Sequence, residues 1–388
     1  MWLQALPIGT ACALAAVVPS ILQGQSQVPT TQAERSATFP EPFSLVRGLR
    51  ELANGVVLVT DWTEERLVAL DFARGSATPL GAVGQGPREY RLPSVLIALP
   101  GDSTLLSDAG NARLAVIGPD LVIHRTIPAQ RPGTSYGIVP RGVDAAGRFY
   151  FGIPPWSQGP NAPPGDSVDL VRWDPRTDVI EPIGRVKGAG RPSWQREGRP
   201  RMTPGIPMVG FSAQDAWVVR PDGHVAIVRS GDYRVEWRSA GGRAASGPSY
   251  AYPRLRVTDA DKRAFVVMFL QSSPMSGRGE GASGLGHTPA EFLSPERVAE
   301  DVRTNEFAEH HPYFRAGGAW LTAEGELWVE RSIPAGAAPA LDVFNGQGRL
   351  VRQVTLPPGR RVVGVGRGAL YAVVKNDDHL ETLERYRR

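Results

Sequence analysis

Short apolar runs alternate with turn residues along most of the chain. The clearest unit, residues 101–118, reads GDSTLLSDAGNARLAVIG. It holds a glycine turn, an apolar run, an aspartate in a polar turn, an arginine and a second apolar run. Such runs, bounded by Gly, Pro, Asn and Asp, are typical of β-strands, and two of them joined by a short turn are typical of a hairpin. The pattern therefore predicts antiparallel strands.

The same unit occurs six times. Its first strand starts near residues 56, 103, 148, 224, 326 and 369. Three of the intervals, 47, 45 and 43 residues, match one four-stranded propeller blade, and the other two, 76 and 102, leave room for a blade and an insertion. A short apolar stretch before each unit predicts an innermost strand that ends in a tight glycine turn. We therefore predict an all-β fold, a six-bladed β-propeller with a partly helical insertion, because a ring of blades buries the faces that a single blade exposes.

The two ends of the chain are expected to meet in the last blade. The sixth unit finishes with a strand near residues 383–387, and no further strand follows it. Residues 37–43, ATFPEPF, are the segment that we expect to add an outer strand there. Such a strand would close the ring and cover a free sheet edge.

Three segments interrupt the repeat. Residues 154–166 and 188–207 are rich in proline and glycine, which predicts surface loops. The largest insertion, residues 254–312, contains a flexible glycine-rich stretch at 276–286. We expect this insertion to lie over one face of the ring as a lid or docking surface.

Two helix starts flank that glycine-rich stretch. Thr258 is followed three residues later by Asp261, which is typical of a capping box. Ser294 precedes a proline at the first helical position. The expected helices therefore run from about 258 to 271 and from about 294 to 307.

One stretch between two units has a more specific signature. Residues 84–90 read GQGPREY, a proline follows, and residues 108–113 read DAGNAR. This stretch resembles the NHL-type repeat, which typically runs G-x-G-P-G-E-F, a proline, a strand and then D-x-x-N-x-R. The resemblance implies a bacterial, exported six-bladed propeller from a family mostly without assigned activity. The repeat residues, which we expect to act structurally, are Gly84, Gly86, Pro87, Glu89, Tyr90, Asp108, Asn111 and Arg113.

The first residues predict export. Residues 1–26 hold an uncharged apolar run and a small-x-small site at Gly24 and Ser26, as in a secretory signal peptide. We predict cleavage after Ser26, so that residues 27–388 form a propeller without a membrane span, in the periplasm, outside the cell or at the cell envelope; an uncleaved anchor is the alternative. Cys12 is the only cysteine, so the mature chain would have no thiol and no disulfide.

The distribution of charged residues suggests a class of ligand for the central channel. The net charge of +4 is small and the arginines are scattered, which argues against nucleic-acid binding. Near the starts of the inner strands, however, several arginines recur. If they converge, the channel mouth would favour an anionic ligand. The candidate channel-mouth residues are Arg47, Arg141, Arg315 and Arg361, with Ser94 beside them.

Signals for catalysis are sparse. Residues 279–284 match G-x-G-x-x-G formally but do not follow a strand. The sequence has no H-E-x-x-H motif or EF-hand loop. The adjacent His310 and His311, near Glu306 and Glu309, are weak metal candidates, because neighbours on a helix point about 100° apart. We therefore expect these histidines to lie at a solvated helix end, where the helix dipole favours them, and predict no metal site.

The leading functional interpretation is an exported, monomeric scaffold that binds a protein, peptide or glycan through its loop face. The alternative is a metal-dependent enzyme, a lactonase-like hydrolase or a lyase, with its site in the channel; a third is a sensor domain docked to a membrane complex. For that enzyme, an axial Ca²⁺ of the kind that six-bladed lactonases use is the possible cofactor. Asp144 and Asp215 lie near the inner strands but at turn or loop positions, so no cofactor is predicted. Converging titratable groups at the channel mouth would favour the enzyme.

Overall fold

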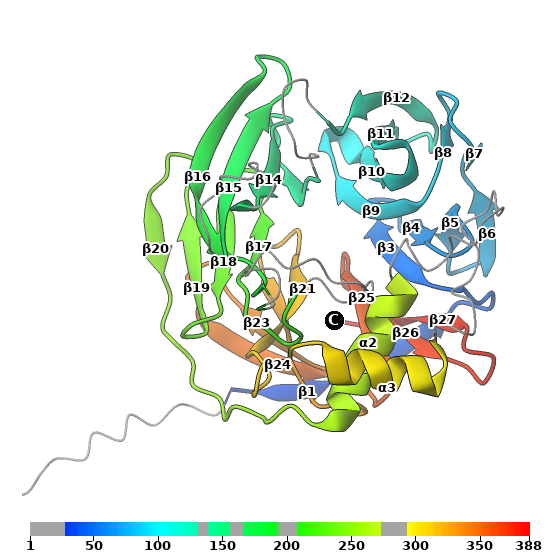
Figure 1. The fold of residues 1–388 in the computed structure, drawn as a ribbon. Helices are drawn as coiled ribbons and strands as arrows, with labels where there is room; N and C mark the ends of the chain where they lie inside the picture. The colour runs from blue at the N-terminus through cyan, green and yellow to red at the C-terminus, as the bar shows by residue number, and fades with distance from the viewer. Residues whose placement is uncertain (1–27, 131–138, 156–165, 192, 194–207, 273–292) are drawn as a thin grey trace, which may run out of the picture.

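Six antiparallel sheets form a closed ring in the computed structural model (Figure 1). The structure describes residues 28–388 apart from 131–138, 156–165, 192, 194–207 and 273–292. The innermost strands of neighbouring sheets contact one another all the way round. The fold is therefore the predicted six-bladed β-propeller.

Each blade contains four strands, numbered below in order from the channel outward. Blades 1 and 2 contain β3 (Val46–Glu51), β4 (Val57–Asp61), β5 (Arg66–Asp71), β6 (Ser76–Pro79), then β9 (Pro93–Ala98), β10 (Thr104–Asp108), β11 (Arg113–Ile117) and β12 (Ile123–Pro128). Blades 3 and 4 contain β13 (Gly142–Val143), β14 (Phe149–Ile153), β15 (Ser167–Asp174), β16 (Val179–Lys187), then β17 (Ala216–Val219), β18 (Val225–Arg229), β19 (Arg234–Arg238) and β20 (Ala244–Ser246). Blades 5 and 6 contain β21 (Phe314–Leu321), β22 (Leu327–Arg331), β23 (Ala340–Phe344), β24 (Leu350–Thr355), then β25 (Arg360–Val365), β26 (Ala369–Lys375), β27 (Glu381–Arg387) and β2 (Arg35–Thr38).

The second strand of each blade starts within one residue of the predicted position, at 57, 104, 149, 225, 327 and 369. These strands read as continuous apolar runs because a blade packs between two others and is buried on both faces; all five residues of β4 are buried. The tight turns before them are also as predicted. Gly55, Gly223 and Gly325 have φ of 85°, 80° and 89°, a region that glycine enters without strain.

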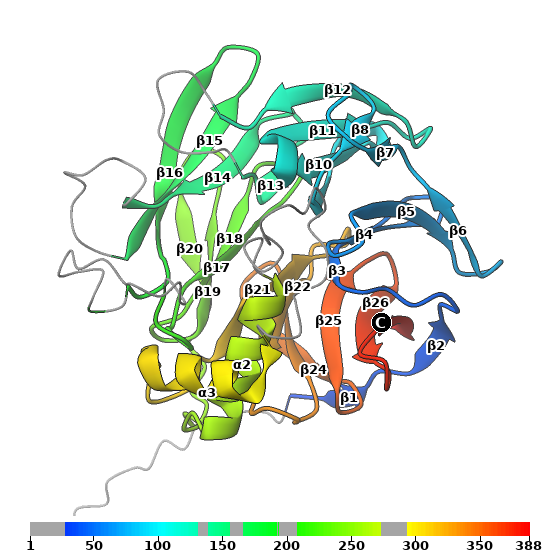
Figure 2. The ribbon, with the colours of Figure 1, turned by 45° about the vertical axis from the view of Figure 1, so that its right-hand side comes forward.

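The N-terminal segment closes the ring. Strand β2 pairs antiparallel with β27, and Figure 2 shows the blue β2 beside the red C-terminal strands. Phe39 and Phe43 follow β2 and are each 1% exposed in the core of blades 1 and 6. The predicted closure by residues 37–43 is therefore present, although the paired strand begins two residues earlier.

A second N-terminal strand extends blade 5. Strand β1 (Thr30–Gln32) lies parallel to the outer strand β24, with Thr30 opposite Gln353. The sequence did not predict this pairing, since β1 has three exposed residues and no alternation of apolar and polar positions. The short parallel pair β7 (Ala82–Val83) and β8 (Glu89–Tyr90) links blades 1 and 2. Two 3-10 turns, η1 (Pro100–Asp102) and η2 (Ala109–Asn111), complete blade 2.

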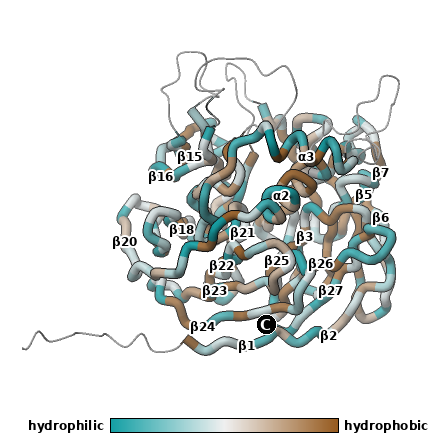
Figure 3. The backbone as a smooth tube through the Cα atoms, turned by 60° about the horizontal axis from the view of Figure 1, so that its bottom comes forward, coloured by the Kyte–Doolittle hydropathy of each residue, from teal (hydrophilic) through white to brown (hydrophobic). Residues whose placement is uncertain are grey.

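Two helices occupy the long connection between β20 and β21. Helix α2 (Asp259–Ser272) begins with the predicted capping box, because the Asp261 backbone N–H donates to Thr258 Oγ1 and Asp261 Oδ2 accepts from the Thr258 N–H. Helix α3 (Pro295–Thr304) ends three residues before the predicted end, where Asn305 caps it by donating to the Asp301 carbonyl. In the tilted view of Figure 3 both helices lie at one end of the ring.

Helices α2 and α3 share a small apolar core of their own. Val266, Leu270 and Val298 are buried in it, and Phe265 and Phe307 pack against them. Neither helix has the length and apolar character needed to cross a membrane, as judged over the described residues. The predicted loops at 154–166 and 188–207 and the stretch at 276–286 lie mostly or wholly outside the described residues.

Candidate functional site

We call the end of the ring at which the inner strands begin the channel mouth. The four arginines predicted for it lie at or near these strand starts. Arg47 and Arg315 are the second residues of β3 and β21, Arg361 is the second residue of β25, and Arg141 directly precedes β13. The arginines thus come from blades 1, 3, 5 and 6. Ser94, in contrast, is 8% exposed and its carbonyl accepts a hydrogen bond from Thr60.

Two of these arginines are neutralised by carboxylates. Arg361 lies 2.7 Å from Glu381, which is 1% exposed, and it also donates to the Val46 carbonyl. Arg315 lies 2.6 Å from Glu330, which is 7% exposed. Because their positive charges are balanced inside the protein, these two arginines mainly hold the mouth in shape.

Arg47 and Arg141 have a different environment. The Arg47 guanidinium lies 4.5 Å from the centre of the Trp62 ring, and that of Arg141 lies 5.7 Å from the Trp217 ring. Both side chains are exposed to solvent. Burial among protein atoms nevertheless lowers the pKa of both guanidinium groups, and Arg361 lowers that of Arg47 further. Protein atoms thus replace part of the hydration of both guanidinium groups, although their side chains still contact solvent.

The inner strands contain more arginines than carboxylates. Their described residues include one carboxylate, Glu51, at the end of β3 away from the mouth. Burial raises the pKa of Glu51, and its carboxylate lies 3.9 Å from Arg385. The arginines on these strands are Arg47, Arg50, Arg315, Arg360 and Arg361. Four of these arginines pair with carboxylates of other segments, so the positive charge on these strands is largely balanced; the pairs are Arg50–Asp102, Arg315–Glu330, Arg360–Glu384 and Arg361–Glu381.

The repeat residues of blade 2 form a clamp between two loops. Asp108 is fully buried and accepts hydrogen bonds from the Arg91 backbone, from Asn111 and from Arg113, whose Nε lies 2.7 Å away. Arg113 also donates to the carbonyls of Gly86 and Glu89. The carboxylate, amide and guanidinium therefore tie the loop that leaves blade 1 to the hairpin of blade 2.

The rest of the repeat motif completes this clamp. Glu89 accepts from the Gly86 N–H at 2.6 Å, and Asn111 donates to the Gly84 carbonyl at 2.9 Å. A Cβ on Gly84 would come within 2.1 Å of the Glu89 carboxylate, so a side chain there would displace this carboxylate from the Gly86 N–H. Tyr90 is 3% exposed, and its hydroxyl accepts from the Leu67 backbone. Pro87 lies inside the same turn.

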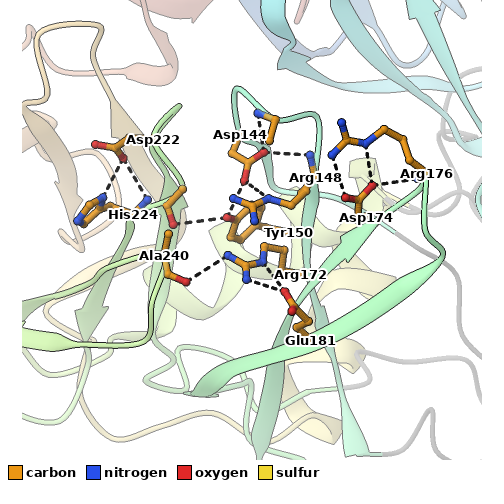
Figure 4. A network of polar contacts seen from close by, with 12 residues as sticks. Asp144, Arg148, Tyr150, Arg172, Asp174, Arg176, Glu181, Asp222, His224 and Ala240 are labelled. Atoms are coloured by element: carbon orange, nitrogen blue, oxygen red, sulfur yellow. Dashed lines mark hydrogen bonds and ion pairs between the residues drawn. The ribbon is translucent and has the colours of Figure 1, made fainter.

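The two aspartates considered near the channel, Asp144 and Asp215, do not fit a calcium site. Asp144 already accepts hydrogen bonds from Arg148 and Tyr150 and from two backbone N–H groups, within the polar network of Figure 4. Asp215 likewise accepts from Arg229 and Ser230. Across the described residues no group of three or more His, Cys, Asp or Glu side chains could hold a metal ion. Ca²⁺ prefers several free oxygen ligands, which these saturated carboxylates do not offer.

The two adjacent histidines point to different environments. They lie in an extended segment that forms a bridge with Arg256, not at a helix end as predicted. His310 is partly exposed and lies 3.9 Å from Glu309, whereas His311 is 4% exposed. Because extended backbone sends successive side chains to opposite sides, the pair cannot chelate one ion.

His311 instead meets two residues that the sequence did not bring together. Its Nδ1 lies 3.1 Å from Ser332 Oγ, and its Nε2 lies 3.2 Å from Asp261 Oδ2. Asp261 was predicted only as a helix cap, and Ser332 was not singled out. No local motif joins them, since they come from a helix start, an extended segment and a turn that are far apart in the chain.

Comparisons with known proteins do not show a family for this chain. No protein-family model matches the chain, and no curated protein matches it. Among solved structures, it is similar to a calcium-binding regucalcin from Agrobacterium tumefaciens (13% identity, TM-score 0.41, 93% of this chain and 97% of that chain) and a gluconolactonase from Xanthomonas campestris (10%, 0.44, 93% and 96%). It is also similar to a Bacteroides fragilis protein proposed to be exported (11%, 0.49, 92% and 94%). At these values the similarities carry no argument about activity.

Proposed function

We propose that this protein is an exported binding propeller that takes an anionic ligand, carrying carboxylate or phosphate groups, at its channel mouth. The observation that carries the proposal is Arg141. Its guanidinium is exposed, its pKa is lowered by burial, and the described residues place no carboxylate within ion-pair distance of it. A bound anion would supply the missing countercharge.

The surrounding residues support an anion over other ligands. The inner strands, as far as the structure describes them, carry a single carboxylate, so an approaching anion meets little like charge at the mouth. Planar guanidinium groups bind carboxylates and phosphates through paired N–H donors. The indole rings of Trp62 and Trp217 lie under two of these guanidinium groups and limit the directions in which they can point.

The first test is a thermal-shift screen of residues 27–388. Citrate and inorganic phosphate are the anionic probes, and neutral glycerol and glucose are the matched controls. A ligand that binds only the folded state raises stability by about 2.7 kcal/mol at a hundred times its Kd. We expect the anions to raise the melting temperature and the neutral compounds to leave it unchanged. Equal shifts, or none with any anion, would count against an anion site.

An enzyme is the second candidate function. Proteins of similar structure include a gluconolactonase, which is a hydrolase. The described residues do not fit a metal ion in the channel, so we propose no metal-dependent reaction. What favours an enzyme is the contact of His311 with Ser332 and Asp261, which requires no metal.

A further inference from the structure

Three side chains from distant segments meet where the β20–β21 connection contacts blade 5. Asp261 lies in the first turn of α2, His311 lies three residues before β21, and Ser332 directly follows β22. Since β22 runs antiparallel to β21, Ser332 lies at the same end of the ring as the channel mouth. The order is carboxylate, imidazole, hydroxyl, with contacts of 3.2 and 3.1 Å. A carboxylate, an imidazole and a hydroxyl in this order activate a serine nucleophile. Here Nδ1 faces the hydroxyl and Nε2 faces the carboxylate, which is the reverse of the Ser-His-Asp template.

The three residues differ in solvent exposure, as a serine nucleophile site requires. Asp261 is 2% exposed and His311 is 4% exposed, whereas Ser332 is only half-buried. The ring of Phe211 packs edge-on against the imidazole, with centroids 4.8 Å apart. The acid and the base are thus shielded from water, while Ser332 is the most exposed of the three residues.

The protonation pattern also suits a general base. Burial raises the pKa of Asp261, but hydrogen bonds from Thr258 and the Ala335 backbone outweigh it and lower that pKa to about 2. The ionised carboxylate favours a proton on His311 Nε2, which leaves Nδ1 to accept from Ser332. The Nε2 contact lacks the alignment of a full hydrogen bond. Catalytic hydrogen bonds of ligand-free enzymes are often long and tighten when substrate binds.

A purely structural role explains only part of this arrangement. Asp261 caps α2 and accepts from Ala335, so it fastens the insertion to the ring. That anchoring does not require an imidazole against a half-exposed hydroxyl. Blade 4 offers a comparison, because Ser230 follows Arg229 at the end of β18 just as Ser332 follows Arg331 at the end of β22. Ser230 donates to the carboxylate of Asp215, which is an ordinary turn contact.

We propose that Ser332 is the nucleophile of a carboxylic-ester hydrolase site, with His311 as general base and Asp261 as a positioning residue. Ser332 Oγ forms a bond to the acyl carbon as its proton passes to His311 Nδ1. The ester C–O bond then breaks, and the departing alcohol takes that proton. Water attacks the acyl-enzyme by the same route, which releases the acid and restores the serine.

The test is covalent labelling of residues 27–388 with a biotinylated fluorophosphonate, followed by peptide mapping. We expect one adduct, on Ser332, together with hydrolysis of p-nitrophenyl acetate. Ser332→Ala should abolish both and lower the melting temperature only slightly, because it leaves the buried His311 Nδ1 without its partner but keeps the backbone bond to Tyr313. Ser230→Ala, the matched control, should retain both. Absence of labelling in folded wild-type protein, or equal labelling of Ser332→Ala, would overturn the proposal.

The pH dependence of the labelling rate separates a positioning role of Asp261 from a purely structural one. We expect Asp261→Asn to slow labelling at least tenfold at neutral pH, with a smaller loss at high pH where the base matters less. A uniform loss across the pH range would mean that Asp261 only anchors the insertion. This proposal is independent of the anion site, since neither labelling nor ester hydrolysis requires Arg141.

Discussion

A disulfide between the first and last strands is expected to lock the propeller ring. Ala37 on β2 lies opposite Arg385 on β27. Directly paired strand residues have the Cα separation that a disulfide requires. The one natural cysteine, Cys12, lies in the predicted signal peptide, so Ala37→Cys with Arg385→Cys gives residues 27–388 a single pair of thiols.

The magnitude follows from the length of chain that the disulfide would enclose. The loop from Ala37 to Arg385 contains about 350 residues, for which the chain-entropy relation gives about 5 to 6 kcal/mol of stabilisation as an upper limit. Native strain and residual structure in the unfolded chain reduce such values, so we expect about 3 kcal/mol. The measurement is urea unfolding of the double variant, oxidised and reduced.

The reduced variant is its own control, because it carries the same substitutions. We expect the oxidised form to have the higher free energy of unfolding and the reduced form to resemble the parent. If the cysteines do not oxidise in the folded protein, β2 does not lie beside β27. If they oxidise without stabilising, the chain ends are not the weak point of the ring.

Three further predictions concern buried polar groups. Asp108→Asn should lower the free energy of unfolding by about 3 kcal/mol, measured in urea, because it leaves the Arg113 guanidinium half-buried without its carboxylate. The pKa of Asp261 is lowered to about 2, so the ionised carboxylate contributes about 2 kcal/mol to the free energy of unfolding above the unfolded pKa. This contribution should be lost as the pH falls from about 4 to 2. Asp261→Asn should flatten that part of the pH–stability curve. Tyr233→Phe should cost about 1 to 3 kcal/mol, because it removes a donor from buried Asp342. Since burial raises the pKa of Asp342, stability should decline as pH rises through that pKa, and more steeply in Tyr233→Phe.

Each of these predictions has a contrary outcome. Asp71→Asn, in an exposed turn, is the control for Asp108→Asn, and equal effects would mean that the clamp contributes nothing. An acid limb unchanged by Asp261→Asn would show that other carboxylates govern acid unfolding. A Tyr233→Phe variant with wild-type stability would show that Asp342 does not need this hydroxyl.

The sequence predicted the ring because its strongest signal is repeated. The second strands of all six blades are buried on both faces, so each reads as an apolar run whose start can be located within a residue. Helix caps carry equally local signals, which is why the start at Thr258 could be predicted. A residue whose hydrogen-bond or ion-pair partner lies on another element has no such local signal in the sequence.

The site illustrates that limit. Arg361 and Arg315 could be predicted at the mouth, but their partners Glu381 and Glu330 come from other strands, and only the register shows that they are neutralised. His311 was interpreted as part of a metal pair or a solvated helix end, because the sequence did not show that α3 stops at Thr304. Its contact with Ser332 depends on how the insertion packs on blade 5.

The most direct test of the central claim is the affinity of charge-matched variants for citrate by isothermal titration calorimetry. Arg141→Gln removes a guanidinium at the channel mouth. Arg185→Gln removes one from the outer strand of the same blade, where the side chain is 76% exposed and pairs with Asp169. We predict that Arg141→Gln raises the Kd at least tenfold, which corresponds to about 1.4 kcal/mol, and that Arg185→Gln leaves it unchanged. Equal Kd values for both variants and the wild-type protein would contradict an anion site at the channel mouth.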